Sequence, residues 1–315
     1  MRVLVTGGAG FLGSHLCDRL VADGHDVVCV DDLSTGRRRN IEPLLAGGRF
    51  RFLQADVVDP PPLEGPLDRV FHLACPVGAA HYAGRPIATL RASGEGARRC
   101  LDLAAECGAT FVLASTSEVY GDPEVHPQVE TYPGRVSPVG PRSAYTEGKR
   151  FAEALAVAYG RERGVRVRIA RIFNTYGPRA RPDDGRVVSN FIVRALAGRP
   201  LAVHGDGRQT RSFCYSSDMV EALLRLAEAG AEADGKPVNL GNPEEVSILD
   251  LAREILDLAG SKARIEFAPM MPEDPVRRRP DITRARQLLN WQPRVTRRQG
   301  LTATIRYYRE EEPTP

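Results

Sequence analysis

The chain has 315 residues, with 43 lysines and arginines against 40 aspartates and glutamates, so its formal net charge is only +3. This near balance argues against proteins that bind nucleic acid or a membrane surface, which carry a marked excess of basic residues. No apolar stretch is long enough for a membrane span and the first residues do not form a signal peptide, so we expect a soluble, cytoplasmic protein. The six cysteines lack the spacing of metal ligands, and we expect no metal site.

The chain begins with a predicted strand, turn and helix that suit a dinucleotide. Residues 2–6 are mostly apolar, and a glycine-rich turn and a helical pattern through Leu16 and Leu20 follow. Glycines let the backbone approach a pyrophosphate, and the helix amino terminus adds partial positive charge. The turn residues predicted to bind the cofactor are Gly7, Gly10, Phe11, Leu12 and Gly13. Glycines also form plain tight turns, which remains the alternative.

A second predicted strand, residues 27–30, ends in the pair Asp31 and Asp32. This is the distance along the chain at which a carboxylate meets the adenosine ribose of a dinucleotide. A carboxylate there repels a 2′-phosphate, so the pair favours NAD over NADP. The three arginines at 37–39 follow closely and leave NADP open as the alternative.

Two further predicted strands, 52–57 and 69–74, should border the adenine and the cofactor riboses with their carboxyl ends. From these ends we predict four cofactor contacts, namely Asp56, Val57, Leu73 and Ala74. Asp56 is the predicted adenine contact, and a carboxylate that only stabilises a turn is an equally good interpretation.

The strand predicted at 110–114 runs into Ser115, Thr116, Ser117 and Glu118. Ligands of open parallel sheets lie beyond the carboxyl ends of the strands, so these polar groups should face the site. Small hydroxyls after a strand also form ordinary turns.

Tyr145 and Lys149 are four residues apart in a predicted helix and should share one face. The ammonium of Lys149 can then lower the pKa of the phenol from about 10 toward working pH. Tyr145 is therefore a candidate base, and a surface tyrosine beside a solvated lysine is the plainer alternative.

Together these motifs resemble the extended short-chain dehydrogenase/reductase superfamily of nucleotide-sugar enzymes, and within it the UDP-glucuronate decarboxylases, also called UDP-xylose synthases. The resemblance covers nearly the whole chain and is carried by the stretches 113–126, 140–152, 168–191 and 277–283, with the runs 119–128, 171–179 and 184–191 especially specific.

The resemblance implies roles for individual residues. Tyr145 becomes the base on the sugar 4-hydroxyl, and Lys149 its pKa partner and a contact to the nicotinamide ribose. Thr116, Ser117 and Glu118 lie along the sugar, and Arg278 reaches the site from the substrate-binding part. The implied substrate-binding residues are Tyr82, Asn174, Arg186, Val188, His204, Gln209, Arg211 and Arg278. Among them, Asn174 and Arg211 hold the diphosphate and its ribose, the backbone at Val188 meets the uracil, and His204 stacks on the base.

The implied reaction is NAD-dependent decarboxylation of UDP-glucuronate to UDP-xylose by C4 oxidation, loss of CO2 and C4 re-reduction. The alternatives are a UDP-uronate 4-epimerase and a nucleotide-sugar 4,6-dehydratase, which start from the same 4-ketone. A dehydratase carries aspartate then glutamate where this chain has Ser117 and Glu118. A regulator that binds NAD(H) or a nucleotide sugar without turnover is the non-enzyme alternative.

The chain departs from the decarboxylases in one loop. Where they have a serine-proline-alanine-serine-proline run, residues 75–82 read Cys-Pro-Val-Gly-Ala-Ala-His-Tyr. This loop should lie beside the sugar. It lacks the serine hydroxyls expected to contact the sugar carboxylate, so the sequence leaves the identity of the sugar open.

The expected fold is a doubly wound α/β Rossmann sheet with a smaller α/β substrate-binding domain. We expect residues 1–174, with returns near 212–241, to form the NAD-binding domain, and 175–211 with 242–315 to form the second. The resemblance also implies a homodimer through a four-helix bundle built from helices around 88–107 and 144–163, although core packing alone explains their apolar faces.

Overall fold

A computed structural model describes residues 1–60, 62–63, 65–78, 84–270 and 277–311. Its strands are β1 (Arg2–Thr6), β2 (Asp26–Asp31), β3 (Phe50–Gln54), β4 (Arg69–His72), β5 (Thr110–Thr116), β6 (Arg166–Ile172), β7 (Thr175–Tyr176), β8 (Leu201–His204), β9 (Thr210–Ser212), β10 (Cys214–Tyr215), β11 (Pro237–Leu240), β12 (Glu245–Ser247), β13 (Ile265–Ala268) and β14 (Arg277–Arg278). Its helices are α1 (Phe11–Ala22), α2 (Glu42–Leu45), α4 (Pro86–Arg91), α5 (Ala97–Cys107), α6 (Ser143–Arg163), α7 (Val187–Leu196), α8 (Ser216–Glu228), α9 (Ile248–Ala259), α10 (Thr283–Leu289) and α11 (Arg297–Glu311).

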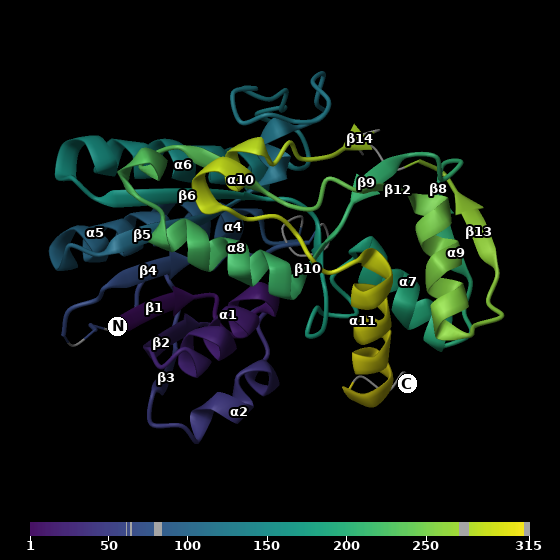
Figure 1. Cartoon of the computed structure of the whole chain (residues 1–315), viewed down its shortest axis with the longest axis horizontal. Helices are drawn as coiled ribbons and strands as arrows, with labels where there is room; N and C mark the ends of the chain where they lie inside the picture. The colour runs from purple at the N-terminus through teal and green to yellow at the C-terminus, as the bar shows by residue number, and fades with distance from the viewer. Residues whose placement is uncertain (61, 64, 79–83, 271–276, 312–315) are drawn as a thin grey trace.

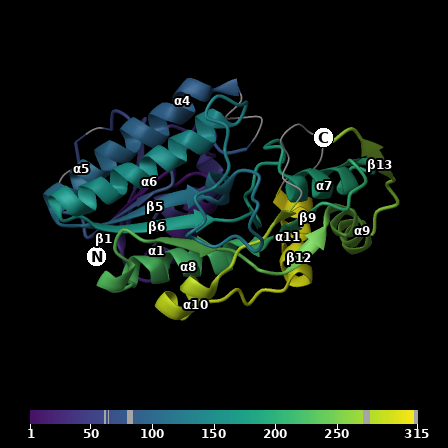
Figure 2. The ribbon, with the colours of Figure 1, turned by 90° about the horizontal axis from the view of Figure 1, so that it is seen from above.

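Seven strands of the described chain form one large sheet in the order β11-β6-β5-β4-β1-β2-β3, and every pairing in it is parallel. Strands β1, β2 and β5 contain continuous apolar runs, as expected when a sheet is covered on both faces, whereas β6 alternates arginine with apolar residues. Figure 2 shows α4, α5 and α6 on one face of the sheet and α1, α8 and α10 on the other. The predicted doubly wound α/β architecture is therefore confirmed.

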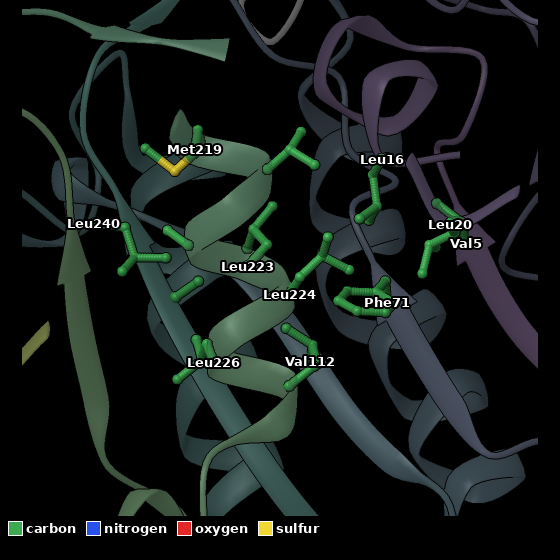
Figure 3. Packing of buried hydrophobic residues seen from close by; sticks show 14 of the residues in the cluster. Val5, Leu16, Leu20, Phe71, Val112, Met219, Leu223, Leu224, Leu226 and Leu240 are labelled. Atoms are coloured by element: carbon green, nitrogen blue, oxygen red, sulfur yellow. The ribbon is translucent and has the colours of Figure 1, made fainter. Parts of the chain in front are cut away.

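Each face of the sheet has its own apolar core. On one face α8 places Met219, Leu223 and Leu226 against the strands, beside Leu16 and Leu20 of α1 (Figure 3). The other face is covered by α5 and α6, where Leu101 and Ala156 are fully buried. Burial of each large aliphatic side chain contributes about 1.5–3 kcal/mol, so the two cores fix the sheet that carries the site.

The smaller part of the molecule lies at the opposite end from the amino terminus, with α7, α9 and α11 around short strands (Figure 1). Its core contains Phe191 and Ile192 of α7, Leu251 and Ile255 of α9, and Leu301 of α11. A three-stranded sheet, β12-β9-β14, borders this part, and there Arg278 of β14 pairs with Arg211 of β9. No described helix is both long and apolar enough to cross a membrane.

Candidate active site

A cavity of about 640 Å³ runs from the glycine turn after β1 to the start of α7. Of the site residues predicted from the sequence, all that the structure describes line this one cavity: Gly7, Gly10, Phe11, Leu12, Gly13, Asp31, Asp32, Asp56, Val57, Leu73, Ala74, Thr116, Ser117, Glu118, Tyr145, Lys149, Asn174, Arg186, Val188, His204, Gln209, Arg211 and Arg278. Tyr82 lies outside the described residues. Side chains that are far apart in the chain thus meet at one place.

The glycine turn at one end of the cavity is too tight for side chains. Gly7 has a φ of 71°, in the left-handed region that favours glycine. A Cβ on Gly13 would lie 2.1 Å from the carbonyl oxygen of Gly7. The helix α1 begins immediately afterwards, and no side chain caps its amino terminus. Backbone N–H groups and the helix dipole are therefore directed toward the cavity, as an anion site requires.

The two carboxylates after β2 have different environments. Asp31 is buried and accepts hydrogen bonds from the backbone N–H groups of Ala9 and Leu33, at 3.0 and 2.8 Å. Burial raises the pKa of Asp31, although these two hydrogen bonds oppose the shift. Asp32 is exposed and accepts from the N–H of Ser34 at 2.9 Å. Asp31 thus braces the glycine turn, whereas Asp32 is open to the cavity.

The three arginines at 37–39 do not line the cavity. Arg37 donates to the Arg179 carbonyl oxygen at 3.2 Å, and Arg38 pairs with Glu42 at 3.5 Å. Arg37 and Arg38 thus contact other groups, and none of the three arginines lies where it would support the NADP alternative.

Asp56 accepts a hydrogen bond from the Val58 N–H at 2.9 Å and also lines the cavity. The interpretation of Asp56 as a carboxylate that stabilises a turn is therefore correct. Because Asp56 also lines the cavity, it can contact a ligand there as well.

At the centre of the cavity, Thr116 ends β5 and Tyr145 lies in the first turn of α6. Both side chains are buried, and their hydroxyl groups are hydrogen-bonded to each other. Burial raises the pKa of Tyr145 well above its usual value, and the nearby Cys75 and Glu118 add to this shift, while the Thr116 bond opposes it.

The sequence-based expectation for this pKa was wrong in direction. Lys149 was expected to lower the pKa of Tyr145, but loss of water around the phenol outweighs its neighbours in the structure. Lys149 is 2% exposed, and its Nζ donates to the Ala114 carbonyl oxygen at 2.8 Å. This bond fixes the ammonium beneath the cavity, one helical turn from Tyr145.

Next to Tyr145, Glu118 lies between two arginines. Its Oε1 is 3.8 Å from Nη1 of Arg278, and its Oε2 is 3.9 Å from Nη1 of Arg142. Sequence analysis missed Arg142, whose only signal was its place three residues before Tyr145. The sugar end of the cavity therefore carries charges of both signs, supplied by β14, α6 and the turn after β5.

A buried clamp holds the segment that carries Arg278. Gln128, which is fully buried, accepts at its Oε1 from the N–H of Arg279 at 2.7 Å, and its own N–H donates to the Arg279 carbonyl oxygen at 2.9 Å. The Gln128 carbonyl oxygen accepts from the N–H of Asp281 and from Nδ2 of Asn239, each at 2.9 Å. We call these contacts the Gln128 clamp, and no motif in the sequence predicted it.

The clamp is connected to the catalytic helix. Asn239 accepts from the Tyr120 hydroxyl at 2.7 Å, and that hydroxyl accepts from Arg171 at 3.0 Å. Arg171 in turn binds both carboxylate oxygens of Glu153 on α6, at 3.0 and 2.8 Å. A continuous, largely buried network thus joins the helix of Tyr145 to the strand segment of Arg278.

The far end of the cavity is lined by the smaller part of the molecule. His204 donates from Nδ1 to the Pro269 carbonyl oxygen at 2.9 Å, and Gln209 donates to the His204 carbonyl oxygen at 2.8 Å. The Oε1 atom of Gln209 is buried and has no hydrogen-bond partner among the described residues. Arg186 stacks over the Phe11 ring, 5.5 Å from its centroid, and so spans the cavity toward the glycine turn.

The sequence pattern of the NAD dependent epimerase/dehydratase family matches residues 3–241. The chain belongs to this family.

Individual relatives are more informative than the family as a whole. The chain is 51% identical to UDP-glucuronic acid decarboxylase 1 of Xenopus tropicalis, over 98% of this chain and 72% of that protein. It is 52% identical to UDP-glucuronic acid decarboxylase 4 of Arabidopsis thaliana, over 98% of this chain and 69% of that protein.

Solved structures of the family share the fold at lower identity. UDP-glucose 4-epimerase of Thermotoga maritima, solved with UDP-glucose, has a TM-score of 0.88 and 29% identity, over 98% of this chain and 99% of that one. UDP-glucuronic acid 4-epimerase of Bacillus cereus, solved with UDP-glucuronic acid and NAD, has a TM-score of 0.86 and 30% identity over the same shares.

Membership of this epimerase/dehydratase family makes NAD the cofactor of the cavity, and the residues present fit it. The side-chain-free turn at Gly7 and Gly13 leaves room for a pyrophosphate. Asp32 is exposed at this end of the cavity, where a carboxylate could accept hydrogen bonds from ribose hydroxyls and would repel a 2′-phosphate. Among the described residues no group of three or more His, Cys, Asp or Glu side chains could hold a metal ion.

Proposed function

We propose that this protein is an NAD-dependent UDP-glucuronate decarboxylase that converts UDP-glucuronate to UDP-xylose and CO2. One observation carries the proposal: Thr116, Glu118, Tyr145 and Arg278 meet in a single cavity of a chain about half identical to UDP-glucuronic acid decarboxylases along nearly its whole length. A protein that only binds NAD and a nucleotide sugar would not need these four side chains together.

The reaction begins at the sugar C4. The glycine turn and Asp32 would hold NAD, which would supply the hydride acceptor for C4 and the hydride donor for its final reduction. Tyr145 removes the proton of the 4-hydroxyl, and Thr116, hydrogen-bonded to Tyr145, orients that hydroxyl. Burial keeps the free phenol protonated even though the Lys149 ammonium lies one helical turn away. Tyr145 would therefore become an effective base only when further positive charge, such as an oxidised nicotinamide ring would supply, lies beside it.

The resulting 4-ketone is β to the C5 carboxylate, so the C5–carboxylate bond breaks and its electrons move to the ketone oxygen as CO2 leaves. The hydroxyls of Tyr145 and Thr116 donate hydrogen bonds to that oxygen and stabilise the enolate. Protonation at C5 and return of the hydride to C4 then give UDP-xylose, so the cycle is redox-neutral.

Other cavity residues divide between the two ligands. We assign NAD to the glycine turn, Asp31, Asp32, Asp56, Val57, Leu73 and Ala74, which belong to residues 1–174. The UDP group is assigned to Asn174, Arg186, Val188, His204, Gln209 and Arg211. The buried, unpaired Oε1 of Gln209 supports recognition of a nucleobase N–H beside His204. This division corresponds to an NAD-binding domain of 1–174 with 212–241, and a nucleotide-sugar domain of 175–211 with 242–315.

A homodimer is part of the proposal. Ile87 and Leu90 of α4 and Phe151 of α6 are 73%, 45% and 56% exposed, although they are large and apolar. These helices lie next to each other on one face of the molecule (Figure 2). Covering them with the same face of a second subunit would form a four-helix bundle. A cytoplasmic location remains a prediction of the sequence.

Proton NMR of the purified protein with UDP-glucuronate and NAD tests the activity. The expected product is a pentose with a C5 methylene group. A uronate epimerised at C4 would instead establish a 4-epimerase, and no change of the sugar in the presence of bound NAD would support a binding protein.

A further inference from the structure

One face of α6 contacts the end of β5 through three side chains that are spaced four residues apart along the helix. Tyr145 is hydrogen-bonded to Thr116, and Lys149 donates to a backbone carbonyl oxygen of the same strand. The third side chain is Glu153, whose Oε1 accepts from the Ser115 hydroxyl at 2.5 Å. Glu153 has no role in the steps above, yet it joins the catalytic helix to the strand of Thr116.

The carboxylate of Glu153 is held in one orientation. Arg171 of β6 donates to it from two nitrogens, from Nε to Oε1 at 3.0 Å and from Nη2 to Oε2 at 2.8 Å. Its Nη1 donates to the Tyr120 hydroxyl and to the Glu130 carbonyl oxygen, at 3.0 and 3.1 Å. The side chains of Glu153 and Arg171 are only 12% and 13% exposed. These bonds and the burial leave the carboxylate little freedom to move.

The strand pairing places this ion pair close to the catalytic hydroxyls. Ser115 of β5 lies opposite Arg171 of β6, and Thr116 follows directly. Apolar packing of α6 against the sheet is not directional, so it resists separation of the two more than it resists sliding. Hydrogen bonds are directional, and those of Glu153 therefore fix where the helix lies along β5.

We propose that Glu153 is a positioning residue for proton transfer at C4: it sets the place of α6 along β5, and with it the arrangement of the Tyr145 and Thr116 hydroxyls. This inference rests on the proposed function, because it takes Tyr145 as the base. Both hydroxyls must reach the sugar 4-hydroxyl at once, and a misplacement of about 1 Å can cost about 100-fold in rate. Lys149 constrains the helix less, because its long flexible stem can follow a shift.

Loss of this position should lower kcat rather than binding. Neither Glu153 nor Arg171 lines the cavity, so the Kd of NAD and the KM of UDP-glucuronate should change less than about 3-fold. The slowed step is the transfer at C4, so kcat of the variants should show a primary isotope effect with deuterium at C4. A merely structural role would reduce Tm and the fraction of active protein without making this step limiting.

Two variants remove the bond from either side. Ser115→Ala leaves the ion pair of Glu153 and Arg171 in place, and its kcat should fall about 5-fold. Glu153→Met removes the acceptor altogether, and its kcat should fall about 100-fold. In the Glu153→Met background, Ser115→Ala should add less than about 2-fold, because both changes break the same bond. A full further loss would mean that Ser115, which lines the cavity, acts on a ligand directly, and it would overturn the inference.

Ser261→Ala is the matched control. Ser261 donates to the Ala195 carbonyl oxygen at 2.6 Å and so joins the segment after α9 to α7, and neither residue lines the cavity. This variant should lose about as much Tm as Ser115→Ala and keep the wild-type kcat. Wild-type kcat in Ser115→Ala, or no isotope effect on its kcat, would overturn the positioning role even if Glu153→Met does not fold.

The outcomes separate this inference from the proposed function. If wild-type protein forms UDP-xylose and Ser115→Ala keeps its kcat, the decarboxylase stands and the positioning role fails. If wild-type protein instead epimerises UDP-glucuronate at C4 and Ser115→Ala slows this reaction with an isotope effect at C4, the positioning role stands and the proposed function fails.

Discussion

The two ends of the cavity are built in different ways. The cofactor end is formed by the backbone: the turn at Gly7 and Gly13 and the open amino terminus of α1 create the space, and the residues lie close together in the chain. The sugar end is formed by side chains from α6, the turn after β5 and β14, with Arg278 more than a hundred residues from Tyr145. A backbone site is visible as a motif, whereas a side-chain site depends on packing that brings distant elements together.

The largest expected effect is at the sugar end. Replacing Tyr145 by Phe removes the proton acceptor for the 4-hydroxyl, so kcat for UDP-glucuronate should fall about 1,000-fold or more, within the range for general bases. The Kd of NAD should stay the same, because the glycine turn is untouched. Initial rates and calorimetry measure the two quantities.

Tyr159→Phe is its control on the same helix. Tyr159 donates to Asp102 at 2.6 Å and does not line the cavity, so this variant should keep full activity. Turnover by Tyr145→Phe at the wild-type rate would remove Tyr145 as the base.

A single methyl group should disable the cofactor end. In Gly13→Ala the added Cβ would lie 2.1 Å from the Gly7 carbonyl oxygen and 2.8 Å from Gly8 Cα, so the turn must shift. Overpacking of this kind costs about 1–3 kcal/mol, which corresponds to a Kd for NAD weakened about 10-fold to 100-fold. Fluorescence titration with NADH, which should weaken in parallel, measures the loss.

Gly160→Ala provides the comparison for Gly13→Ala. Gly160 is inside α6, where a Cβ would be 3.4 Å from its nearest neighbour, the Val165 carbonyl oxygen. Alanine is the better helix former, so this variant should be neutral or up to about 1 kcal/mol more stable. Unchanged NADH affinity in Gly13→Ala would show that the turn does not set the cofactor site.

The Gln128 clamp makes the sugar end sensitive to a residue that does not line it. Gln128→Met keeps the volume but removes the side-chain hydrogen bonds that Gln128 accepts from the Arg279 N–H and donates to the Val125 carbonyl oxygen. Free energy of unfolding should fall by about 1–3 kcal/mol, and kcat/KM by about 10-fold, because Arg278 loses its fixed position. NAD affinity should not change.

Thr304→Val removes another buried hydrogen bond, from Thr304 to the Gly300 carbonyl oxygen at 2.7 Å in α11. It should cost similar stability without a loss of kcat/KM. Equal loss of activity in both variants would mean that Gln128 acts only through stability.

The smallest effect concerns acid stability beside the clamp. Burial alone would raise the pKa of Glu245, but the hydrogen bond from Thr210 and the charge of His126 outweigh it, so the pKa is lowered in the folded state. The folded protein then binds fewer protons at this site than the unfolded chain, and the stabilisation is present above the unfolded pKa of about 4.3. It is lost as the pH falls through the folded value.

Thermal unfolding from about pH 6 down to pH 3.5 checks this linkage. Wild-type protein should lose more Tm over this interval than Glu245→Gln, because the amide does not titrate. Parallel Tm curves would show that Glu245 contributes nothing to acid stability.

The sequence predicted the sheet, the glycine turn and the positions of Tyr145 and Lys149, because each is encoded by local periodicity or spacing. It did not predict the raised pKa of Tyr145, since burial of a phenol depends on the whole cavity. Arg142 and Gln128 were missed for the same reason: an arginine before a helix and a glutamine in a loop have no local pattern. Only the folded chain shows which of its many arginines lie beside Glu118.

The order of strands in the large sheet also has a consequence for protein synthesis. β11 is the last of the seven strands to be synthesised, and it pairs with β6 at one edge of the sheet. A nascent chain that has emerged only to the end of β6 already contains the glycine turn, both aspartates after β2 and Lys149, but leaves the edge of β6 unpaired. On the ribosome these cofactor-end residues therefore emerge together with Glu118 and Tyr145, whereas Arg278 of the sugar end is added only after β11. The exposed edge of β6 is the segment that a chaperone would have to shield until β11 arrives.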